Sequence, residues 1–379
     1  MKAPTIVVNA RMLLKNRLDG TGWFAYQTLR RITSDHPDVR FLFLFDRPYD
    51  PEFLFQDNVT ARVVYPPVRH GLLYYPWYEI GVKRVLDAVQ PDLFLSPDGI
   101  LSLGANCIQL AIVHDINFHH YPKDLPFWTS RYFNRFYPKS VRKATRIVTV
   151  SQYTKHDLMQ TYGADEHKID VVYNGIQEQF APADEQEKEN IRRTYADGQA
   201  YFLFVGSLHP RKNIPRLLTA FQMFKEETKS PMKLIIAGSL FWGGKDIQKI
   251  LRQLSYRADI LFTGRVGNDE LYRLMAGAFC LAYVPYFEGF GIPLLEAMQS
   301  DVPIISANTT SLPEVAGDAA LYVDPFRVEE IKNAMITMTT NATLRHTLIE
   351  HGRKRRKHFS WDSTADKLWA SITLAMTEK

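Results

Sequence analysis

The chain contains few cysteines and no long apolar run. Among its 379 residues only two are cysteines, Cys107 and Cys280, and both lie in apolar stretches. This number excludes a disulfide-stabilised scaffold and a zinc module with several cysteine ligands. No apolar run reaches the ~18 residues of a membrane-spanning helix, and the apolar stretch at the N-terminus is too short for a signal peptide. We therefore expect a cytoplasmic protein, because thiols stay reduced there.

Two common enzyme signatures are also missing. The sequence has no Gly-x-x-x-x-Gly-Lys-[Ser/Thr] loop and no Gly-x-Ser-x-Gly elbow, so it carries neither a P-loop NTPase signature nor a serine hydrolase signature. It also has no internal repeat. Lysine and arginine exceed aspartate and glutamate by 46 to 41, which gives a net charge of +5. So small an excess suits an anionic substrate or a membrane surface, but it argues against a nucleic-acid partner.

What the sequence does contain is a regular alternation of short apolar runs and amphipathic helical patterns. Hydrophobic residues make up 46% and charged residues 23% of the chain, as in ordinary globular proteins. The apolar runs are rich in β-branched residues and too short for helices, so they predict buried strands. They are Thr5–Val8, Phe41–Phe45, Leu93–Leu95, Cys107–Val113, Arg146–Val150, Ile169–Val172, Tyr201–Val205, Lys233–Ala237, Ile260–Thr263, Phe279–Val284, Pro303–Ser306 and Ala320–Val323. Strands that alternate with helices predict parallel sheets covered on both faces, an α/β fold.

The chain is expected to divide into two domains near residue 177. After Asn174-Gly175 the sequence becomes polar and acidic, and a new apolar run then begins at Tyr201. We therefore predict one doubly wound, Rossmann-like domain over residues 1–177 and another over 178–358. Ligands of such sheets bind beyond the carboxyl ends of the strands, so two facing domains would place a binding site in the cleft between them.

The most informative segment runs from Glu288 to Ala297. Its glycines, Gly289 and Gly291, permit a tight loop whose amides approach a ligand closely. A helix that starts after such a loop favours a phosphate or a sugar oxygen, and the carboxylates of Glu288 and Glu296 suit hydroxyl pairs. The segment therefore predicts a loop that binds a polyol or a phosphate. A surface loop with two solvated glutamates is the alternative.

Two adjacent cations, Arg211 and Lys212, follow another apolar run and precede a predicted helix. Cations at the start of a helix oppose the helix dipole, and a nearby negative group would relieve this cost. A pyrophosphate is the obvious candidate, because arginine offers a fork of donors and lysine a point charge. The alternative is a solvated basic turn.

The segment Leu18–Ala25 has the Gly-x-Gly-x-x-Ala spacing of dinucleotide-binding folds. Gly20 and Gly22 are its glycines, and Asp46 ends the next apolar run. However, about ten residues separate the first apolar run from these glycines, whereas the dinucleotide fingerprint requires a tight turn. We therefore expect a flexible glycine loop that lines the cleft rather than a nicotinamide site.

His114 and Asp115 directly follow the run Cys107–Val113, at a position where open α/β sheets place reactive groups. His119 and His120 come shortly after, but this spacing matches no recognised metal-ligand pattern. The sequence therefore predicts a His114–Asp115 pair that binds the substrate, and it predicts no metal site. For His119 and His120, loop histidines without a role remain the alternative.

Basic and aromatic residues interleave between Trp128 and Arg146. The aromatic residues are Trp128, Tyr132, Phe133, Phe136 and Tyr137, and the cations are Arg131, Arg135, Lys139, Arg142, Lys143 and Arg146. A basic amphipathic helix of this kind can lie on an anionic membrane, which makes residues 126–146 a candidate for peripheral contact at the inner face of the membrane. An ordinary helix that packs its aromatic residues into the first domain is the alternative.

Glu288 and Glu296 form a Glu-x7-Glu motif that resembles the signature of the retaining family 4 glycosyltransferases. Further segments fall in the order and spacing of that family. They are Val172-Tyr173-Asn174-Gly175-Ile176, Val205-Gly206-Ser207, Pro210-Arg211-Lys212-Asn213, Ala237-Gly238, Thr263-Gly264-Arg265-Val266, Leu312-Pro313-Glu314-Val315 and Phe359-Ser360-Trp361. The resemblance covers nearly the whole chain. It implies the GT-B fold, in which two Rossmann-like domains face each other across a cleft and the last helix, here residues 359–379, returns to the first domain.

The resemblance also implies roles for individual residues. The implied catalytic residues are His114, Arg211, Lys212 and Glu288. The implied substrate-binding residues are Gly20, Gly22, Asp115, Arg265, Val266, Gly289, Phe290, Gly291, Ile292 and Glu296. Arg211 and Lys212 would hold the donor pyrophosphate, and Glu288 would face the donor sugar. Glu296 would bind the nucleotide ribose, and Arg265 would lie beside the base.

The implied reaction transfers a sugar from a nucleotide sugar, GDP-mannose or a UDP-sugar, with retention at the anomeric carbon. The implied acceptor is a glycan or a lipid-linked saccharide in cell-surface polysaccharide assembly, and no metal or other cofactor is required. Many relatives carry a basic residue where this chain has Ser207, so phosphate neutralisation would depend more on Arg211 and Lys212. A non-hydrolysing nucleotide-sugar epimerase and a non-catalytic sugar-nucleotide binder remain the alternatives.

Overall fold

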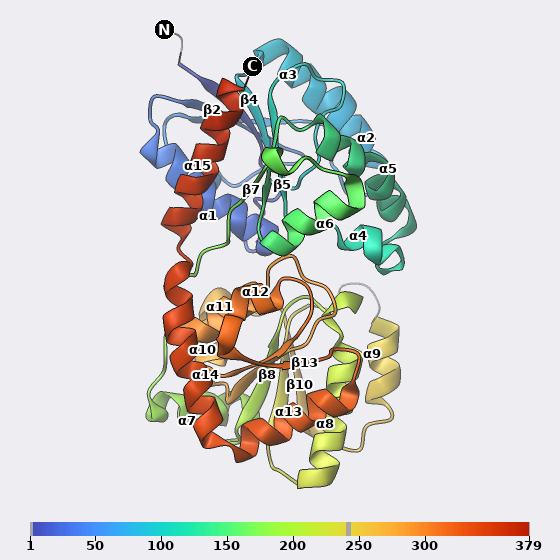
Figure 1. Ribbon diagram of the computed structural model, residues 1–379, viewed down its shortest axis with the longest axis vertical. Helices are drawn as coiled ribbons and strands as arrows, with labels where there is room; N and C mark the ends of the chain where they lie inside the picture. Colours follow the sequence, from blue (N-terminus) through green and yellow to red (C-terminus); the bar gives the residue numbers. More distant parts are fainter. Residues whose placement is uncertain (1–2, 240–243, 379) are drawn as a thin grey trace. The chain divides into compact units, whose positions relative to one another are not determined.

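The structure is a computed structural model that describes residues 3–239 and 244–378, and it forms two compact units (Figure 1). The first unit comprises Met1–Gly175 together with Phe359–Lys379, and the second comprises Ile176–His358. Gln177, which we assigned to the first domain from the sequence, belongs to the second unit, where its side chain accepts a hydrogen bond from the Tyr272 hydroxyl at 3.0 Å.

Within the described residues, the first unit is built on a sheet of seven parallel strands in the order β3-β2-β1-β4-β5-β6-β7. The strands are β1 (Thr5–Asn9), β2 (Arg40–Phe45), β3 (Val59–Val63), β4 (Leu93–Ser96), β5 (Gln109–Val113), β6 (Arg146–Thr149) and β7 (Ile169–Val171). Every strand except β3 coincides with a predicted apolar run. The sequence missed β3 because it is an edge strand with few buried residues, so it lacks the continuous apolar pattern of a central parallel strand.

Helices connect these strands and cover the sheet. They are α1 (Gly20–Asp35), α2 (Tyr74–Pro76), α3 (Lys83–Val89), α4 (Asn117–His120), α5 (Phe127–Lys143), α6 (Gln152–Tyr162) and, from the end of the chain, α15 (Trp361–Thr377). A π-helical turn, Trp77–Val82, joins α2 to α3. Across the residues described in both units, no helix combines the length and apolarity needed to cross a membrane.

Helix α1 begins at Gly20, so the expected flexible glycine loop is wrong. The Asp19 side chain caps the helix by accepting a hydrogen bond from the Gly22 amide at 2.9 Å, which is a standard way to satisfy an orphan N–H group. A Cβ atom at Gly22 would lie 2.9 Å from the carbonyl oxygen of Met12. Close packing in the first helical turn therefore accounts for this glycine, and chain flexibility does not.

Helix α15 packs along α1 within the first unit (Figure 1). The Arg31 guanidinium contacts the Asp362 carboxylate at 2.6 Å, and the rings of His36 and Trp369 stack with their centroids 3.7 Å apart. The last helix thus returns to the first unit, as the sequence resemblance implied.

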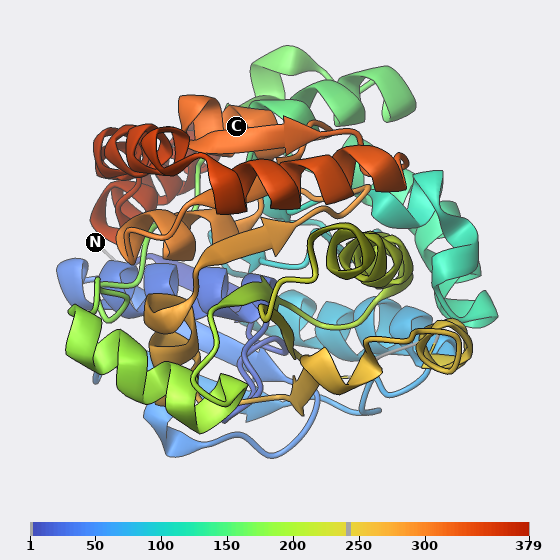
Figure 2. The same cartoon turned by 90° about the horizontal axis from the view of Figure 1, so that it is seen from below.

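The second unit contains, within the described residues, a sheet of six parallel strands in the order β10-β9-β8-β11-β12-β13. The strands are β8 (Tyr201–Val205), β9 (Lys233–Ala237), β10 (Ile260–Gly264), β11 (Cys280–Tyr283), β12 (Ile304–Ala307) and β13 (Ala320–Val323). Its helices are α7 (Glu185–Ala196), α8 (Ile214–Thr228), α9 (Gly244–Leu251), α10 (Asn268–Gly277), α11 (Ile292–Gln299), α12 (Leu312–Ala316), α13 (Val328–Thr340) and α14 (Ala342–Arg355). Helix α8 packs against α9 and α13, whereas α10 packs against α7 and α11 (Figure 2).

The polar segment that follows the first unit forms helix α7 over Glu185–Ala196. Helix α7 is polar over most of its surface, but Ile191 is completely buried. Its side chain lies against Gly277 at the end of α10, where an added Cβ atom would be 2.5 Å from an Ile191 methyl group. Ile191 and Ala196 are therefore the buried residues through which this otherwise polar helix packs in the second unit.

Candidate active site

A buried cluster of charged side chains lies at the carboxyl edge of the second sheet. Glu288, in the turn after β11, uses its Oε1 atom to contact Lys212 at 2.5 Å and Arg211 at 2.8 Å. The Tyr283 hydroxyl at the end of β11 donates to the same oxygen at 3.0 Å and accepts from the Lys212 ammonium at 2.7 Å. Lys212 is 7% and Glu288 6% exposed. Two separate sequence motifs therefore form one site.

The turn that carries both cations is locked by Asn213. This residue ends the short 3-10 turn Pro210–Lys212 with a φ of 61°, in the left-handed region that asparagine tolerates. Its side-chain amide donates to the carbonyl groups of Val284 and Pro325 at 2.9 and 2.7 Å. Since Val284 directly follows β11, this bond fixes the cationic turn relative to the turn that carries Glu288.

The backbone around Glu288 is held from two sides. On one side, the Tyr286 amide donates to the Arg211 carbonyl at 3.0 Å. On the other, the Glu288 amide donates to the Thr310 hydroxyl at 3.2 Å, and the Ser311 hydroxyl donates to the Glu288 carbonyl at 3.0 Å. The turn that carries Glu288 is therefore held by the turn with Arg211 and by the turn after β12. Thr310 and Ser311 follow β12, and the sequence gave no signal for their role.

Two glycines allow the turns near the charged cluster to pack closely. Gly291 has a φ of +98°, and a Cβ atom there would lie 2.5 Å from the Leu312 side chain. A Cβ atom at Gly238, after β9, would lie 1.9 Å from the carbonyl oxygen of Gly206, after β8. No side chain fits at Gly238, so the two turns can approach each other only because that residue is glycine.

The pKa values of the two glutamates of the site are shifted in opposite directions. Burial by itself raises the pKa of Glu288, but Arg211 and Lys212 outweigh it and lower the pKa to about 2. Glu288 is therefore ionised at neutral pH. Glu296 lies on α11, about one turn from the start of the helix. It is also buried, and burial alone raises its pKa to about 8. Near pH 7 Glu296 is therefore mostly protonated, so its carboxyl group is able both to donate and to accept a hydrogen bond.

The buried carboxyl group of Glu296 makes stability depend on pH. Its pKa is about 8 in the folded chain against a usual value of 4.5, so between these values the folded state binds the extra proton. The contribution of Glu296 to the free energy of unfolding therefore falls as the pH rises from 4.5 to about 8. We expect Glu296→Gln to remove this dependence and to gain stability relative to the wild type at the alkaline end.

Urea unfolding of both proteins at several pH values measures this effect. Glu288→Gln is the matched control, because the lowered pKa of Glu288 places its contribution at acidic pH, where it is lost as the pH falls from 4.5 towards 2. A constant difference in stability between wild type and Glu296→Gln across the pH range would contradict a raised pKa for Glu296.

A cavity of about 510 Å³ lies between α9 and β10. Gly238 and Gly264 at the ends of β9 and β10 line it, together with the apolar side chains of Ile247, Leu251 and Phe262. A cavity lined by apolar side chains together with a few polar ones, here Gln248, Arg257 and Thr263, is typical of a small-molecule pocket. Arg265, which is exposed, and Val266, which is half-buried, directly follow β10 beside this cavity.

In the first unit, His114 follows β5 at the carboxyl edge of that sheet. Its Nε2 atom lies 3.0 Å from the carbonyl oxygen of Pro97. Because a carbonyl only accepts, Nε2 carries the proton, and Nδ1 is the acceptor nitrogen of the neutral ring. Burial lowers the pKa of His114, although Asp115 and Asp19 oppose this effect. The Phe24 ring of α1 meets the imidazole edge-on at 5.3 Å. His114 is thus a neutral, oriented hydrogen-bonding group.

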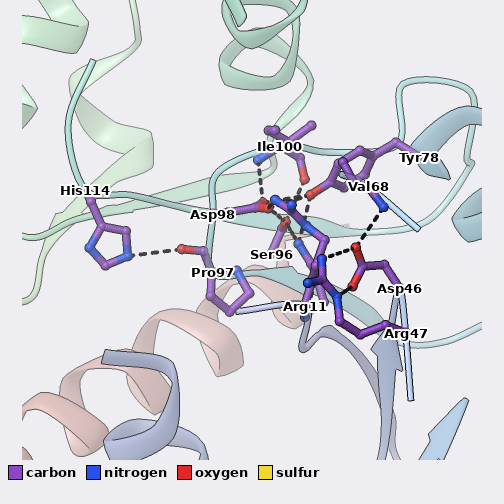
Figure 3. A network of polar contacts seen from close by, with 11 residues as sticks. Arg11, Asp46, Arg47, Val68, Tyr78, Ser96, Pro97, Asp98, Ile100 and His114 are labelled. Atoms are coloured by element: carbon purple, nitrogen blue, oxygen red, sulfur yellow. Dashed lines mark hydrogen bonds and ion pairs between the residues drawn. The ribbon is translucent and has the colours of Figure 1, made fainter. Parts of the chain in front are cut away.

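The turn that holds His114 is part of a buried polar network (Figure 3). Asp98, next to Pro97, accepts hydrogen bonds from the Arg11 guanidinium at 2.7 Å and from the Tyr78 hydroxyl at 2.7 and 2.9 Å. The Ser96 hydroxyl also donates to the Asp98 carboxylate, at 3.0 Å, and so does the Ile100 amide, at 3.2 Å. Although Asp98 follows a predicted strand, the sequence did not single it out as a site-forming residue.

Other residues singled out in the first half of the sequence have local partners. Asp46 pairs with Arg47 and accepts from the Val68 amide. It is therefore part of the framework, consistent with rejecting a nicotinamide site. Asp115 accepts from the Asn117 amide at 3.0 Å and caps a turn, and its predicted contact with substrate remains a prediction. Among the described residues, no group of three histidine, cysteine, aspartate or glutamate side chains is arranged to hold a metal ion.

Comparison with known proteins matches both halves of the chain. Residues 18–180 match the sequence profile described as Glycosyltransferase Family 4, and residues 185–355 match the profile described as Glycosyl transferases group 1. This chain belongs to the family 4 glycosyltransferases. O-antigen chain mannosyltransferase B of Escherichia coli is 30% identical to this glycosyltransferase over 251 residues, which cover 66% of this chain and 66% of that protein.

Solved structures show the same architecture. Sucrose-phosphate synthase from Thermosynechococcus elongatus gives a TM-score of 0.79 at 15% identity and covers 98% of this chain and 99% of that one. HepE of Anabaena in complex with UDP-glucose gives a TM-score of 0.75 at 16% identity, with 98% and 99% covered. At these identities the likeness concerns the fold. The glycosyltransferase has the GT-B fold that the resemblance implied.

Proposed function

We propose that this glycosyltransferase transfers a sugar from a nucleotide sugar to a glycan or lipid-linked saccharide, with retention at the anomeric carbon. The observation that carries the proposal is the buried cluster of Arg211, Lys212 and Glu288 at the carboxyl edge of the second sheet. Open α/β sheets bind their ligands at this edge. The cluster offers two cations to the diphosphate of a donor and one carboxylate to its sugar.

The cluster suits a diphosphate because its cations are already assembled. Arginine has five N–H donors and lysine three, so both residues can contact a carboxylate and a phosphate at the same time. Glu288 remains ionised because its pKa is about 2, and it keeps the two cations together before the donor binds. A preorganised positive site stabilises charge that develops on the leaving diphosphate. We propose that these residues and the loop amides make a metal cofactor unnecessary.

The remaining donor contacts follow the family motif. We propose that Glu296 binds the ribose through its carboxyl group and that Arg265 and Val266 flank the base, next to the cavity between α9 and β10. The loop residues Gly289, Phe290, Gly291 and Ile292 are proposed to offer amides to the donor sugar and its phosphates. In the first unit, Gly20, Gly22 and Asp115 are proposed to contact the donor.

His114 is proposed to bind the transferred sugar. Its Nδ1 atom is an acceptor because Nε2 donates to the Pro97 carbonyl, so a sugar hydroxyl can donate to it. No side chain of this site is assigned as an enzymic nucleophile. We therefore propose a front-face reaction in which the leaving phosphate takes the proton of the acceptor hydroxyl, which accounts for retention.

We propose mannose as the transferred sugar and cell-surface polysaccharide as the product. A relative that is 30% identical is described as an O-antigen chain mannosyltransferase, which favours GDP-mannose as the donor. A structural relative was solved with UDP-glucose, so UDP-sugars are the second candidates. We further propose that the enzyme works in the cytoplasm, at the inner face of the membrane.

A thermal-shift panel of UDP, GDP, ADP and their common sugar conjugates, without added metal, tests the donor site. A ligand at ~100 times its dissociation constant adds about 2.7 kcal/mol of stability, so one base should stand out, and we expect GDP. Consumption of the sugar conjugate only when a glycan acceptor is present would support transfer. Conversion without an acceptor would indicate an epimerase, and binding without any turnover would indicate a sugar-nucleotide binder.

A further inference from the structure

Large apolar side chains are exposed mainly in one region of the first unit. Nine such residues are exposed in the described part of the chain, and six of them lie between residues 65 and 80 or at the start of α5. These six are Tyr65 (67% exposed), Leu72 (55%), Tyr75 (49%), Ile80 (46%), Phe127 (68%) and Trp128 (45%). We call them the apolar face. Single exposed apolar residues are ordinary on protein surfaces, but a cluster of this kind marks a binding surface.

The two segments that carry the apolar face lie side by side, as α2 and α5 do in Figure 1. A Cβ atom at Gly71 would lie 2.5 Å from the Thr129 amide nitrogen, so the chain next to Leu72 touches the start of α5. The Tyr75 and Phe136 rings have their centroids 5.4 Å apart. The two segments that carry the apolar face are therefore in contact with each other, although they are about fifty residues apart in the sequence.

The apolar face differs from the one expected from the amphipathic pattern of residues 126–146. In the middle of α5, Tyr132 and Tyr137 are buried, and Phe133 and Phe136 pack partly against the same core. This part of the pattern is therefore ordinary core packing. The exposed aromatic residues are Phe127 and Trp128 in the first turn, and their neighbours come from residues 65–80, a segment in which the sequence pattern gave no signal.

Exposed arginines flank the residues of the apolar face in the sequence. Residues 126–146 contain six arginine or lysine residues and no carboxylate, but one of the six, Arg146, is buried and paired with Asp170 and Glu378. Of these, Arg131 and Arg135 are exposed on the two turns that follow Trp128. Arg69 is exposed beside Leu72. The carboxylate of Glu79 is engaged by the backbone amides of Leu103 and Gly104, at 2.6 and 2.9 Å. A binding partner that matches this face is therefore apolar where it meets the six side chains and negatively charged where it meets the flanking arginines.

We propose that the apolar face and its flanking arginines dock this protein on an anionic lipid bilayer. Aromatic side chains favour the boundary between headgroups and acyl chains, and each cation near an anionic leaflet strengthens binding about fivefold. The chain would lie on the bilayer through the first turn of α5 and residues 65–80, with no segment crossing it. The proposal is independent of the donor chemistry, since every residue that carries it lies outside the donor cluster.

Sedimentation of the full chain with vesicles tests this proposal. We expect binding to phosphatidylcholine vesicles that contain phosphatidylglycerol, weak binding to phosphatidylcholine alone, and release by salt. The double variant F127S/W128S and the double variant R131Q/R135Q should each bind at least tenfold more weakly than the wild type. The matched control is Leu374→Ser, because Leu374 is 44% exposed in the same unit but lies outside the face. It should bind like the wild type.

Three results would overturn the proposal. They are absence of binding to anionic vesicles at low salt, equal binding of F127S/W128S and wild type, and self-association without lipid that F127S/W128S abolishes. The last result would show that a second copy of the chain covers the face. The thermal shift with donor nucleotides serves as an independent readout. A variant that keeps this shift but loses vesicle binding separates membrane docking from the proposed sugar transfer.

Discussion

Replacing Lys212 with methionine should lower turnover of the donor at least ~10²-fold, as expected when one charge-stabilising donor is removed from an active site. The Lys212 ammonium is buried and lies 2.5 Å from Glu288 and 2.7 Å from the Tyr283 hydroxyl. Methionine keeps most of the volume of the side chain but removes its charge and its donors. Turnover, followed as release of the nucleotide diphosphate, should fall more than donor affinity does, because the lost charge acts mainly on the leaving group.

The fold should tolerate this change, because Glu288 keeps Arg211 at 2.8 Å and Tyr283 at 3.0 Å. The matched control is Lys225→Met. Lys225 is also a buried lysine of the second unit, but it contacts the carbonyl groups of Ser230 and Met232 and the Asp259 carboxylate. This control should lose stability and keep its turnover. Unchanged turnover in Lys212→Met would contradict a role for Lys212 at the diphosphate.

Replacing Asp98 with alanine should destabilise the protein by ~3–5 kcal/mol, the usual effect of leaving one partner of a buried ion pair without its counter-charge. The Arg11 and Asp98 side chains are 7% and 9% exposed and lie 2.7 Å apart. Burial by itself raises the pKa of Asp98, but the Arg11 charge and the hydrogen bonds from Arg11 and Tyr78 outweigh it and lower the pKa. The folded state therefore holds an ionised carboxylate that Arg11 needs.

Urea unfolding measures this loss, and two comparisons interpret it. Asp87→Ala removes the partner of Lys83 in an exposed pair and should cost only ~0.3–0.5 kcal/mol. The double variant R11M/D98A should be more stable than Asp98→Ala, because no unpaired charge remains buried. If R11M/D98A instead loses as much free energy of unfolding as Arg11→Met and Asp98→Ala lose together, charge pairing does not explain the effect of Asp98→Ala. Since Asp98 neighbours the Pro97 carbonyl that orients His114, Asp98→Ala should also weaken turnover.

The sequence predicted most strands because central parallel strands are buried on both faces and therefore read as continuous apolar runs. It missed β3, where only the pairing with β2 compensates for a polar composition. It read Gly20 and Gly22 as a flexible loop because about ten residues separate them from the first apolar run, too many for the tight turn of a dinucleotide site. In the structure, the Asp19 cap and close packing against Met12 place them in α1. The sequence pattern therefore gave the wrong secondary structure where a helix cap or packing against a neighbouring turn determines it.

For the candidate site, too, local motifs could be predicted from the sequence, whereas contacts between distant residues could not. The Glu-x7-Glu motif and the Arg-Lys pair are local in the sequence, and the chemistry of their side chains already indicated a polyol and a pyrophosphate, while the family resemblance implied a nucleotide sugar. Their pairing is not local, because Lys212 and Glu288 are 76 positions apart. Arg11 and Asp98 are 87 positions apart, so neither ion pair has a periodicity or spacing that a reader of the sequence could find.

By itself, the sequence determined the α/β class, the two-domain order and the family, because these depend on apolar runs and short motifs that each segment carries alone. The tertiary structure decided which charges meet, which glutamate stays ionised and which keeps its proton, and which aromatic residues face outward. These properties depend on burial and on partners from distant segments, and both exist only once the sheets have formed. The contrast between Glu288 and Glu296 shows this most directly. The same side chain, eight residues apart, has a pKa of about 2 in one place and about 8 in the other.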